Sequence, residues 1–410
     1  MLQWAQPYSI LLFLDNNHYT SPYSKYECLL AAGSVNIITD TGQEALSLLA
    51  RQHSEKNDWF FGHINYDYKN HLEKKLTSTH PIRTGWPDLH FFCPAIVCYI
   101  EAGKDILNIE SYTLSPLDIY NEIINTVLPP LMQQPALSFS QTINKAHYLQ
   151  IIAALRQHIA DGDCYEINFC NNAFCNNAMI DPVQVFHRLN ALSPAPFAAC
   201  YRLDDKYMMC ASPERYLQKN GDRVIAEPIK GTARRDADAQ KDLQIKTALR
   251  QDIKERAENV MIVDLMRNDL ARCCEVGSVQ VDELFGVYTF PQVHQLISTV
   301  SGKIKNDLTF ADAIKCSFPM GSMTGAPKIK VMQLIDKYEA SRRELFSGTV
   351  GYITPEGDFD FNVVIRSLFY STKDQYLSYQ TGGAITYDSK PEQEWEEMRL
   401  KAWALEKIFA

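Results

Sequence analysis

Short hydrophobic runs separated by polar residues dominate the first third of the chain, and this pattern predicts β-strands. The runs are rich in β-branched, aromatic and aliphatic residues and cover residues 8–14, 26–32, 35–39, 59–68 and 91–99. Residues 113–134 are predicted to form a helix and a linker that ends near Pro129-Pro130. We therefore expect a β-rich amino-terminal part, residues 1–140, and a second part, residues 141–410, with the boundary around 135–145.

The second part mixes helical and strand patterns. Apolar residues recur at helical spacing in residues 144–160 and 182–192, and residues 236–272 form a long, mostly helical run. The predicted strands are 164–174, 197–203, 207–211, 215–217, 223–225, 348–353, 359–369 and 376–385. A final helix is predicted to begin at the cap Ser389, with Pro391 in its first turn and Glu392 closing a capping box. Its buried stripe is predicted to consist of Trp395, Met398, Ala402 and Leu405.

Composition and charge narrow the class of protein. The 410 residues are 46% hydrophobic and 22% charged, which is typical of a soluble globular protein with two or three domains or one large body. Forty basic and forty-nine acidic residues give a net charge of −9, which argues against a nucleic-acid-binding surface. The eleven cysteines include no Cys-x-x-Cys pair, so we expect reduced thiols in a cytoplasmic protein. The apolar run at residues 10–14 is too short for a signal peptide or a membrane span.

The candidate catalytic residue is Lys230, in the segment Glu227-Pro228-Ile229-Lys230-Gly231-Thr232 at the end of a β-rich run. An amine attacks carbon only when it is deprotonated, whereas an ordinary lysine, with a pKa near ~10.4, is charged at neutral pH. Burial or a nearby cation can lower that pKa to ~7, which corresponds to roughly 4 to 5 kcal/mol. The alternative interpretation of this segment is a lysine at a strand end in solvent.

A hairpin signal at Asn220-Gly221 connects the Lys230 segment to Ser212-Pro213-Glu214-Arg215. A two-residue turn at this position sets Glu214 opposite Glu227 and leaves Lys230 on the other face of the ladder. Pro228 has no N–H to donate to the ladder. We therefore predict a bulge at Pro228 that brings Lys230 and Glu214 to a common face.

Two pairs of glutamates lie three residues apart on predicted helices. Glu255 and Glu258 share one helix face, and Glu394 and Glu397 share a flank of the final helix with Lys401. Each pair by itself is typical of a solvated helix surface, where an i,i+4 ion pair such as Glu397 with Lys401 contributes ~0.2 to 0.5 kcal/mol. If the two helices face each other, four carboxylates converge and require a cation. Oxygen ligands with room for water favour Mg²⁺ over zinc.

Other segments suit an anionic ligand. Residues 318–328 form a glycine-punctuated loop that opens a helix near Pro327, where free N–H groups suit a carboxylate or phosphate, although the spacing is not that of a P-loop. Arg366 lies in an otherwise apolar predicted strand and needs an anionic partner, either an internal acid or a ligand carboxylate. Gly382-Gly383 allows close approach of a ligand or marks a bulge. His294 alternates within a strand, where a core histidine is the simpler interpretation.

Taken together, these segments resemble the chorismate-utilising family, which includes anthranilate synthase component I, aminodeoxychorismate synthase component I, and the isochorismate and salicylate synthases. The resemblance is dense from about 144 to 404 and weak before that. It is carried by segments 212–215, 228–232, 258–270, 293–299, 318–328, 348–352, 360–366 and 382–401. The resemblance implies an α+β fold like that of anthranilate synthase component I, a large two-sheet antiparallel β-sandwich with helices on the outside. It also implies that residues 141–410 are the chorismate-binding catalytic part, intertwined with the first part in one body.

Within this family the lysine discriminates between activities. Aminodeoxychorismate synthases carry lysine in this motif, where anthranilate synthases usually have alanine. The resemblance implies that Lys230 adds to ring carbon 2 of chorismate while Glu214, as general acid, protonates the departing 4-hydroxyl. Ammonia then enters at carbon 4 and expels the lysine, which gives 4-amino-4-deoxychorismate, the precursor of p-aminobenzoate and folate. We recognise no glutamine-hydrolysing segment, so ammonia is expected from solution or from a separate glutaminase subunit.

The same resemblance implies a metal site and a substrate site. Glu258 and Glu397 would bind Mg²⁺ directly, Glu255 and Glu394 would act through water, and the ion would grip the ring carboxylate. The glutamates alone would raise the pKa of Lys230, whereas the cation and desolvation would lower it. The positions that match substrate contacts are Ser322, Tyr352, Arg366, Gly382, Gly383, Lys401 and Thr232, with His294 beside the ring.

Two positions depart from the family pattern, and several activities remain open. Ala384 stands where relatives often have glycine. Glu166 stands where aminating members tend to carry glutamine and hydroxylating members lysine, so activation of water by a lysine is not expected here.

The rival functions are anthranilate synthase component I, an isochorismate or salicylate synthase, and a catalytically silent binding subunit on the same scaffold. The intact set of Lys230, Glu214, Glu258 and Glu397 argues against the silent subunit.

Overall fold

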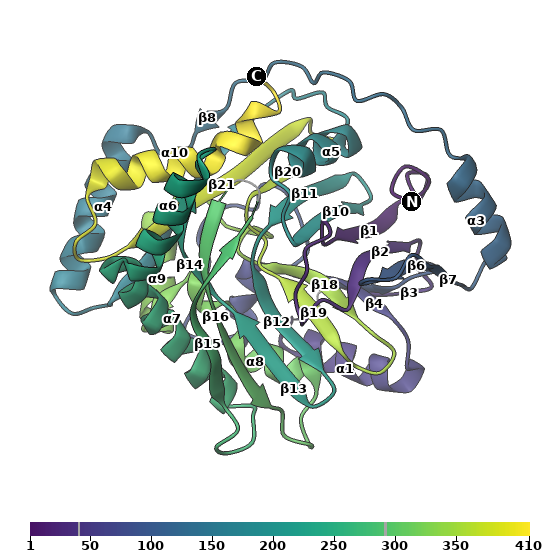
Figure 1. The fold of residues 1–410 in the computed structure, drawn as a ribbon, viewed down its shortest axis with the longest axis horizontal. Coiled ribbons are helices and arrows are strands. Elements are labelled where there is room, and N and C mark those ends of the chain that lie inside the picture. Colours follow the sequence, from purple (N-terminus) through teal and green to yellow (C-terminus); the bar gives the residue numbers. More distant parts are fainter. Residues whose placement is uncertain (40–41, 291–292) are drawn as a thin grey trace.

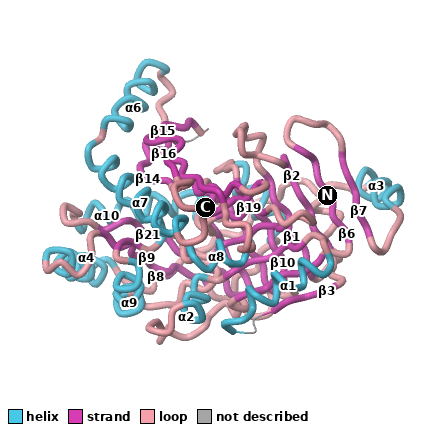
Figure 2. Tube along the Cα trace, turned by 90° about the horizontal axis from the view of Figure 1, so that it is seen from below, coloured by secondary structure: helices cyan, strands magenta, loops and turns pink. Residues whose placement is uncertain are grey.

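Two large antiparallel sheets form the body of the chain in the computed structural model, which describes residues 1–39, 42–290 and 293–410. In Figure 1 the strands lie at the centre, and Figure 2 shows helices such as α1 (Ala45–Lys56), α4 (Lys145–Ala160) and α9 (Lys328–Tyr338) at the outside. All strand pairings within the described residues are antiparallel. The predicted α+β sandwich is therefore confirmed.

The first sheet has the order β17 (Gly325–Ala326), β9 (Glu166–Cys175), β21 (Tyr376–Ile385), β20 (Ser367–Ser371), β11 (Lys206–Ser212), β10 (Phe197–Leu203), β1 (Ile10–Asp15), β2 (Tyr26–Ala32), β6 (Ile96–Glu101) and β7 (Leu107–Ser111), with β8 (Ser140–Gln141) beside β9. The second sheet has the order β14 (Ile229–Arg234), β16 (Val293–Lys303), β13 (Arg223–Glu227), β12 (Arg215–Asn220), β19 (Phe359–Asn362), β18 (Thr349–Ile353), β4 (Phe60–Ile64), β5 (Leu89–Cys93) and β3 (Asn36–Thr39), with β15 (Gln280–Thr289) beside β16.

The remaining helices and helical turns cover the sheets and connect the strands. They are α2 (Lys69–Leu72), α3 (Pro116–Asn125), α5 (Pro182–Leu192), α6 (Ala239–Gln251), α7 (Ile253–Ala271), α8 (Phe310–Ser317), α10 (Pro391–Lys407), η1 (Gly42–Glu44), η2 (Tyr66–Tyr68) and η3 (Gly321–Met323). No helix in the described ranges is long and apolar enough to cross a membrane. All eleven cysteines are described, and each is a free thiol.

Strands from the first 140 residues complete both sheets. In the first sheet β1 pairs with β10, and in the second β4 pairs with β18. Leu12 and Met208 of the first sheet and Phe61 and Phe361 of the second belong to one buried apolar cluster. Burying such a side chain contributes roughly 1.5 to 3 kcal/mol. The two predicted parts therefore share sheets and core, while the boundary near residue 140 stays a prediction.

Two of the predicted strands are each divided between the sheets. The run 91–99 breaks at Pro94 into β5 of the second sheet and β6 of the first. The run 359–369 likewise breaks into β19 and β20, and Arg366 lies in the crossover with φ +50° instead of in a strand. An uninterrupted apolar run does not reveal where a chain leaves one buried sheet for another, because both environments select the same residues.

The predicted start of the final helix is wrong in its detail. Lys390 occupies the cap position of α10, and no side chain caps the helix. Ser389 accepts a hydrogen bond from the Thr386 N–H at 3.1 Å instead, so its hydroxyl closes the preceding turn. The predicted buried stripe is confirmed at Met398, Ala402 and Leu405, each about 1% exposed.

Candidate active site

Lys230 lies in an irregular part of β14, where regular pairing with β16 is interrupted. Residues on both sides of Pro228 pair with β16 in one register, so the predicted bulge at Pro228 is wrong in position. The register shifts only after Ile229, at Lys230-Gly231, and Gly231 has φ +90°. A glycine adopts this left-handed backbone without strain, which explains why the bulge forms there.

The hairpin before β14 also differs from the prediction by one residue. Residues 221–222 form the turn instead of 220–221, and the register shifts again within β12. Arg215, not Glu214, consequently faces Glu227. Glu214 lies just before β12, and its backbone carbonyl accepts a hydrogen bond from Val363 at 3.0 Å.

The Lys230 side chain is buried and forms an ion pair with Glu166 of β9. Lys230 is 7% exposed and Glu166 is 1% exposed, and the Nζ–Oε1 distance is 2.5 Å. Burial alone would lower the pKa of Lys230, but the carboxylates of Glu166, Glu258 and Glu214 outweigh it and raise the pKa above its ordinary value. The expectation that a bound cation lowers this pKa stays a prediction.

Glu166 departs from the family pattern and is not among the predicted site residues. Its signal was a charged residue in a strand whose neighbours Ile167 and Phe169 are fully buried. The second oxygen of Glu166, Oε2, is buried without a hydrogen-bond partner. An unsatisfied buried carboxylate oxygen is costly and points to a ligand, ion or water.

Glu214 lies within electrostatic range of Lys230 and is 4% exposed. Burial raises the pKa of Glu214 to about 7, against opposing effects of the Ser322 hydroxyl and the charge of Lys230. A carboxyl with this pKa is partly protonated at neutral pH and can donate a proton. Arg366 is half-buried, has its pKa lowered by burial, and feels the charge of Glu214. No acid of the described chain lies within ion-pair distance of Arg366, which leaves its guanidinium available to an anion.

The two acidic helix flanks meet around the bulge and around β21. A side chain at Gly231 would place its Cβ 3.0 Å from an oxygen of Glu255 on α7. A Cβ at Gly383 would lie 3.5 Å from oxygens of both Glu394 and Glu397 on α10. The charge of Glu397 raises the pKa of Glu255, so the two acidic flanks lie within electrostatic range of each other. The convergence of four carboxylates on one ion stays a prediction.

The pKa values of the four glutamates are shifted in different directions. Burial raises the pKa of Glu258 to about 7, and burial also raises the pKa of Glu255 and of Glu394. Lys401, whose Nζ lies 2.8 Å from Glu397, lowers the pKa of that carboxyl. Glu258 Oε1 is buried without a hydrogen-bond partner and lies 3.7 Å from Lys254 Nζ, an ion pair without a hydrogen bond.

This donor set suits a hard divalent cation. Within the described ranges, no three carboxylate, imidazole or thiol groups are close enough together to hold an ion by themselves. Mg²⁺ does not need three protein ligands, because it uses one or two carboxylates and takes its other ligands from water and substrate. The unsatisfied oxygen of Glu258 and the carboxylates around Gly383 fit that requirement.

The remaining predicted residues divide into two groups. Ser322 is 6% exposed, and its hydroxyl lowers the pKa of Glu214. Lys401 donates to the Gly382 carbonyl at 2.9 Å. Gly382 does not mark a bulge, since β21 pairs with β9 without a register shift. A Cβ at Gly382 would lie 2.1 Å from the Phe169 carbonyl, so close strand packing explains this glycine.

Three predicted contacts lie apart from this cluster. Tyr352 packs in an aromatic cluster with Tyr26 and Trp59, with ring centroids 5.5 and 6.1 Å away. Thr232 is exposed on β14. His294 is 1% exposed, and its ring nitrogens lie 3.0 Å from Thr289 Oγ1 and 3.0 Å from Asp242 Oδ1 on α6. The interpretation of His294 as a satisfied core histidine therefore agrees with its contacts.

The fold places the chain in a known class. It superposes on anthranilate synthase component I from Streptococcus pneumoniae with a TM-score of 0.82 and 26% sequence identity, covering 95% of this chain and 93% of that one. Residues 15–407 match the model of the chorismate binding enzyme family. The chain belongs to this family.

Two sequence relatives carry more specific names. The aminodeoxychorismate synthase of Streptomyces griseus is 42% identical over 264 residues, which are 64% of this chain and 36% of that protein. Aminodeoxychorismate synthase component 1 of Klebsiella aerogenes is 39% identical over 255 residues, which are 62% of this chain and 56% of that protein. The chain thus matches about half or less of the length of these relatives.

Proposed function

We propose that the chain is the catalytic subunit of an aminodeoxychorismate synthase, which converts chorismate and ammonia to 4-amino-4-deoxychorismate and water. The observation that carries the proposal is a buried lysine, Lys230, in a cluster with an acid, Glu214, whose pKa is raised to about 7. The names of the two sequence relatives support the same activity. A covalent lysine intermediate divides one difficult displacement into two allylic ones.

In the proposed first step, the ammonium of Lys230 gives a proton to Glu166, its partner at 2.5 Å, when chorismate enters. The neutral amine then forms a bond to ring carbon 2 while the bond from carbon 4 to its oxygen breaks. Both ring double bonds shift by one position. Glu214 gives its proton to the leaving hydroxyl, which departs as water, and the enzyme carries a secondary ammonium.

In the proposed second step, ammonia forms a bond to carbon 4, the double bonds shift back, and the bond from carbon 2 to the Lys230 nitrogen breaks. The Glu214 carboxylate takes a proton from the new amino group and is restored as an acid. Glu166 returns its proton to Lys230 and restores the ion pair. No other reactant is consumed, so the atoms and charges balance.

We propose that Glu258 and Glu397 hold Mg²⁺, with Glu255 and Glu394 acting through water. The support is the unsatisfied oxygen of Glu258 and the room that Gly383 leaves beside the two α10 carboxylates. When bound, the ion would neutralise the ring carboxylate of chorismate and offset the surplus of negative charge. Arg366 and Ser322 are proposed to contact the substrate from the opposite side.

We propose that ammonia is supplied by a separate glutaminase. The word "component" in the name of the Klebsiella relative supports a second subunit there. The free state of the cysteines agrees with a reducing compartment, and we propose the cytoplasm.

Anthranilate synthase component I is the second candidate, because the fold matches that of the Streptococcus pneumoniae enzyme across nearly the whole chain. The test is incubation of the protein with chorismate, Mg²⁺ and ammonium, followed by chromatography with absorbance and fluorescence detection. We expect aminodeoxychorismate and no pyruvate. Fluorescent anthranilate as the main product would overturn the proposal in favour of the second candidate. Turnover without any nitrogen source would indicate an isochorismate or salicylate synthase.

A further inference from the structure

Strand β9 carries Glu166 at the border of the first sheet, and its outer edge is only partly covered. The short strand β17 pairs with Glu166 and Ile167 only. At Asn168 the backbone N–H still reaches the Thr324 carbonyl at 2.8 Å, and the side chain donates to the Ser322 carbonyl at 3.1 Å. Beyond Asn168 the loop with Ser322 leaves the strand edge. The next polar backbone groups of β9 therefore need other partners.

A buried ion pair, Glu339 with Arg343, supplies those partners. Arg343 Nη2 donates to the Asn168 carbonyl at 2.8 Å, and Glu339 Oε1 accepts from the Cys170 N–H at 2.9 Å. Arg343 Nη1 donates to the Met323 carbonyl at 2.6 Å, on the loop that carries Ser322. One ion pair thus presents a donor and an acceptor to the strand edge, as a neighbouring strand would, and holds the loop at the same time.

The ion pair is itself fully bonded and enclosed. Glu339 is 4% and Arg343 is 2% exposed, and their closest contact is 2.6 Å. The guanidinium also lies 4.6 Å from the centre of the Tyr66 ring. An Arg fork can bind a carboxylate and two carbonyls at once because its donors have a fixed planar arrangement, which the single ammonium of lysine lacks.

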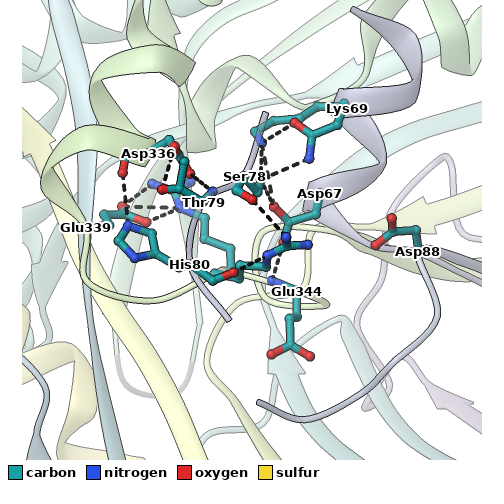
Figure 3. Close-up of polar contacts among 12 residues, drawn as sticks. Asp67, Lys69, Ser78, Thr79, His80, Asp88, Asp336, Glu339 and Glu344 are labelled. Atoms are coloured by element: carbon teal, nitrogen blue, oxygen red, sulfur yellow. Dashed lines mark hydrogen bonds and ion pairs between the residues drawn. The ribbon is translucent and has the colours of Figure 1, made fainter. Parts of the chain in front are cut away.

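Neighbouring carboxylates fix the segment that closes over this region (Figure 3). Asp336 accepts from the Thr79 N–H at 3.1 Å. Glu344 accepts from the Gly85 N–H at 2.9 Å. Asp67 in turn accepts from the Glu344 N–H at 3.0 Å. Residues near 67–85 and the end of α9 therefore form one bonded unit around the ion pair.

We propose that the Glu339–Arg343 pair is a positioning element for the active site. It fixes the loop with Ser322, whose hydroxyl lies near Glu214, relative to the strand with Glu166, which forms the ion pair with Lys230. The acid and the amine come from separate segments, and their relative position depends on this junction. The catalytic consequence depends on the proposed function, whereas the junction itself can be measured without any turnover.

The test compares three variants in the full chain. Arg343→Lys keeps the charge and removes the fork. Glu339→Gln keeps an acceptor for the Cys170 N–H and removes the charge. The control is Arg342→Lys, because Arg342 also donates to backbone carbonyls, including Ser78 at 2.8 Å, but on the segment away from the active site.

Chorismate binding with Mg²⁺ is measured by calorimetry, which gives the number of working sites, and kcat is expressed per working site. We expect kcat to fall about 100-fold for Arg343→Lys, less for Glu339→Gln, and less than two-fold for Arg342→Lys, because a misplacement of about 1 Å can cost that much. A purely structural role would lower the number of sites and leave kcat per site unchanged, and that result would overturn the proposal.

Hydrogen exchange gives the second measurement and needs no substrate. Arg343→Lys is expected to speed exchange in residues 321–325 and 166–170 by at least ten-fold, with smaller changes elsewhere. Unchanged exchange there would overturn the proposal. If wild type forms a product other than aminodeoxychorismate, the proposed function fails, and the variants are then judged on kcat for that product and on exchange. If Arg343→Lys does not fold, Glu339→Gln decides by the same two readouts.

Discussion

Two buried charged clusters of the same chain differ in how completely they are bonded. Arg215 donates to both oxygens of Asp360 at 2.9 Å and also bonds Glu227, so its guanidinium fork is occupied. Around Lys230, by contrast, Glu166 Oε2 and Glu258 Oε1 are buried with no hydrogen-bond partner. Arg215 directly follows Glu214 in the chain, yet the two side chains belong to different clusters.

This difference distinguishes a cluster that stabilises the fold from a cluster that binds a ligand. A saturated buried ion pair has no capacity left for a ligand, and breaking it leaves an uncompensated charge. Buried oxygens without hydrogen-bond partners destabilise the folded protein until a ligand binds them. We therefore expect such oxygens where substrate or metal is held. Variants of the first cluster should therefore affect folding, and variants of the second should affect chemistry.

The largest effect is expected from Lys230→Ala. Removal of the amine removes the covalent route, so we expect aminodeoxychorismate formation to fall at least ~1,000-fold while the fold is retained. Product chromatography and circular dichroism measure the two properties. Lys219→Ala serves as the matched control, because Lys219 is a half-buried strand lysine paired with Asp358 at 3.3 Å. An unchanged rate in Lys230→Ala would exclude the covalent mechanism.

Arg215→Met tests the saturated cluster. The change leaves Asp360 and Glu227 buried without their cation, and we expect a loss of about 3 to 5 kcal/mol in the free energy of unfolding. Urea unfolding measures this loss, and kcat per folded molecule should change much less than in Lys230→Ala. If stability stays the same and chemistry is lost, the division between the two clusters is wrong.

Glu258→Gln tests the open cluster as a metal site. A neutral amide is a poorer ligand for a hard cation, so we expect the Mg²⁺ concentration for half-maximal binding to rise about 10- to 100-fold. Calorimetric titration with Mg²⁺ reads binding without activity. Glu396→Gln on the exposed side of α10, where Glu396 pairs with Lys145 at 3.5 Å, is the control and should leave the titration unchanged. Equal titrations for wild type and Glu258→Gln would remove this residue from the site.

The last prediction concerns pH. The pKa of Glu214 is about 7, so if Glu214 is the proposed general acid, kcat/KM should decline as the pH rises above about 7. The free energy of unfolding should change with pH in the same direction. The pKa of Glu214 is raised in the folded protein, so its contribution to stability is present at low pH and is lost as the pH rises through about 7. Glu214→Gln should therefore be more stable than wild type at pH 8 by roughly 3 kcal/mol, and by much less at pH 5. Urea unfolding at both pH values checks the difference, and a constant difference would contradict it.

The sequence predicts those parts of the candidate site whose arrangement depends only on the spacing of residues along the chain. The glutamate pairs lie three residues apart on helices, and helical geometry puts them on one face whatever surrounds them. Lys230 was marked by its motif and by the adjoining Gly231. Arg343 and Glu339 carry no such signal, because a Glu–Arg pair four residues apart has the same sequence pattern in solvent as in a core. Only the packing of β9, the loop and Tyr66 around the pair distinguishes the two cases.

The amino-acid sequence by itself determined the elements, the family and the residue types of the site, since periodicity and motif are local properties of the chain. The tertiary structure decided the division of single apolar runs between two sheets, the position of the bulge at Lys230-Gly231 and the partner of each buried charge. The physical reason is that register and burial depend on contacts between segments far apart in the chain. Glu166 and Lys230 are separated by 64 residues, and only the folded chain brings their charges within 2.5 Å.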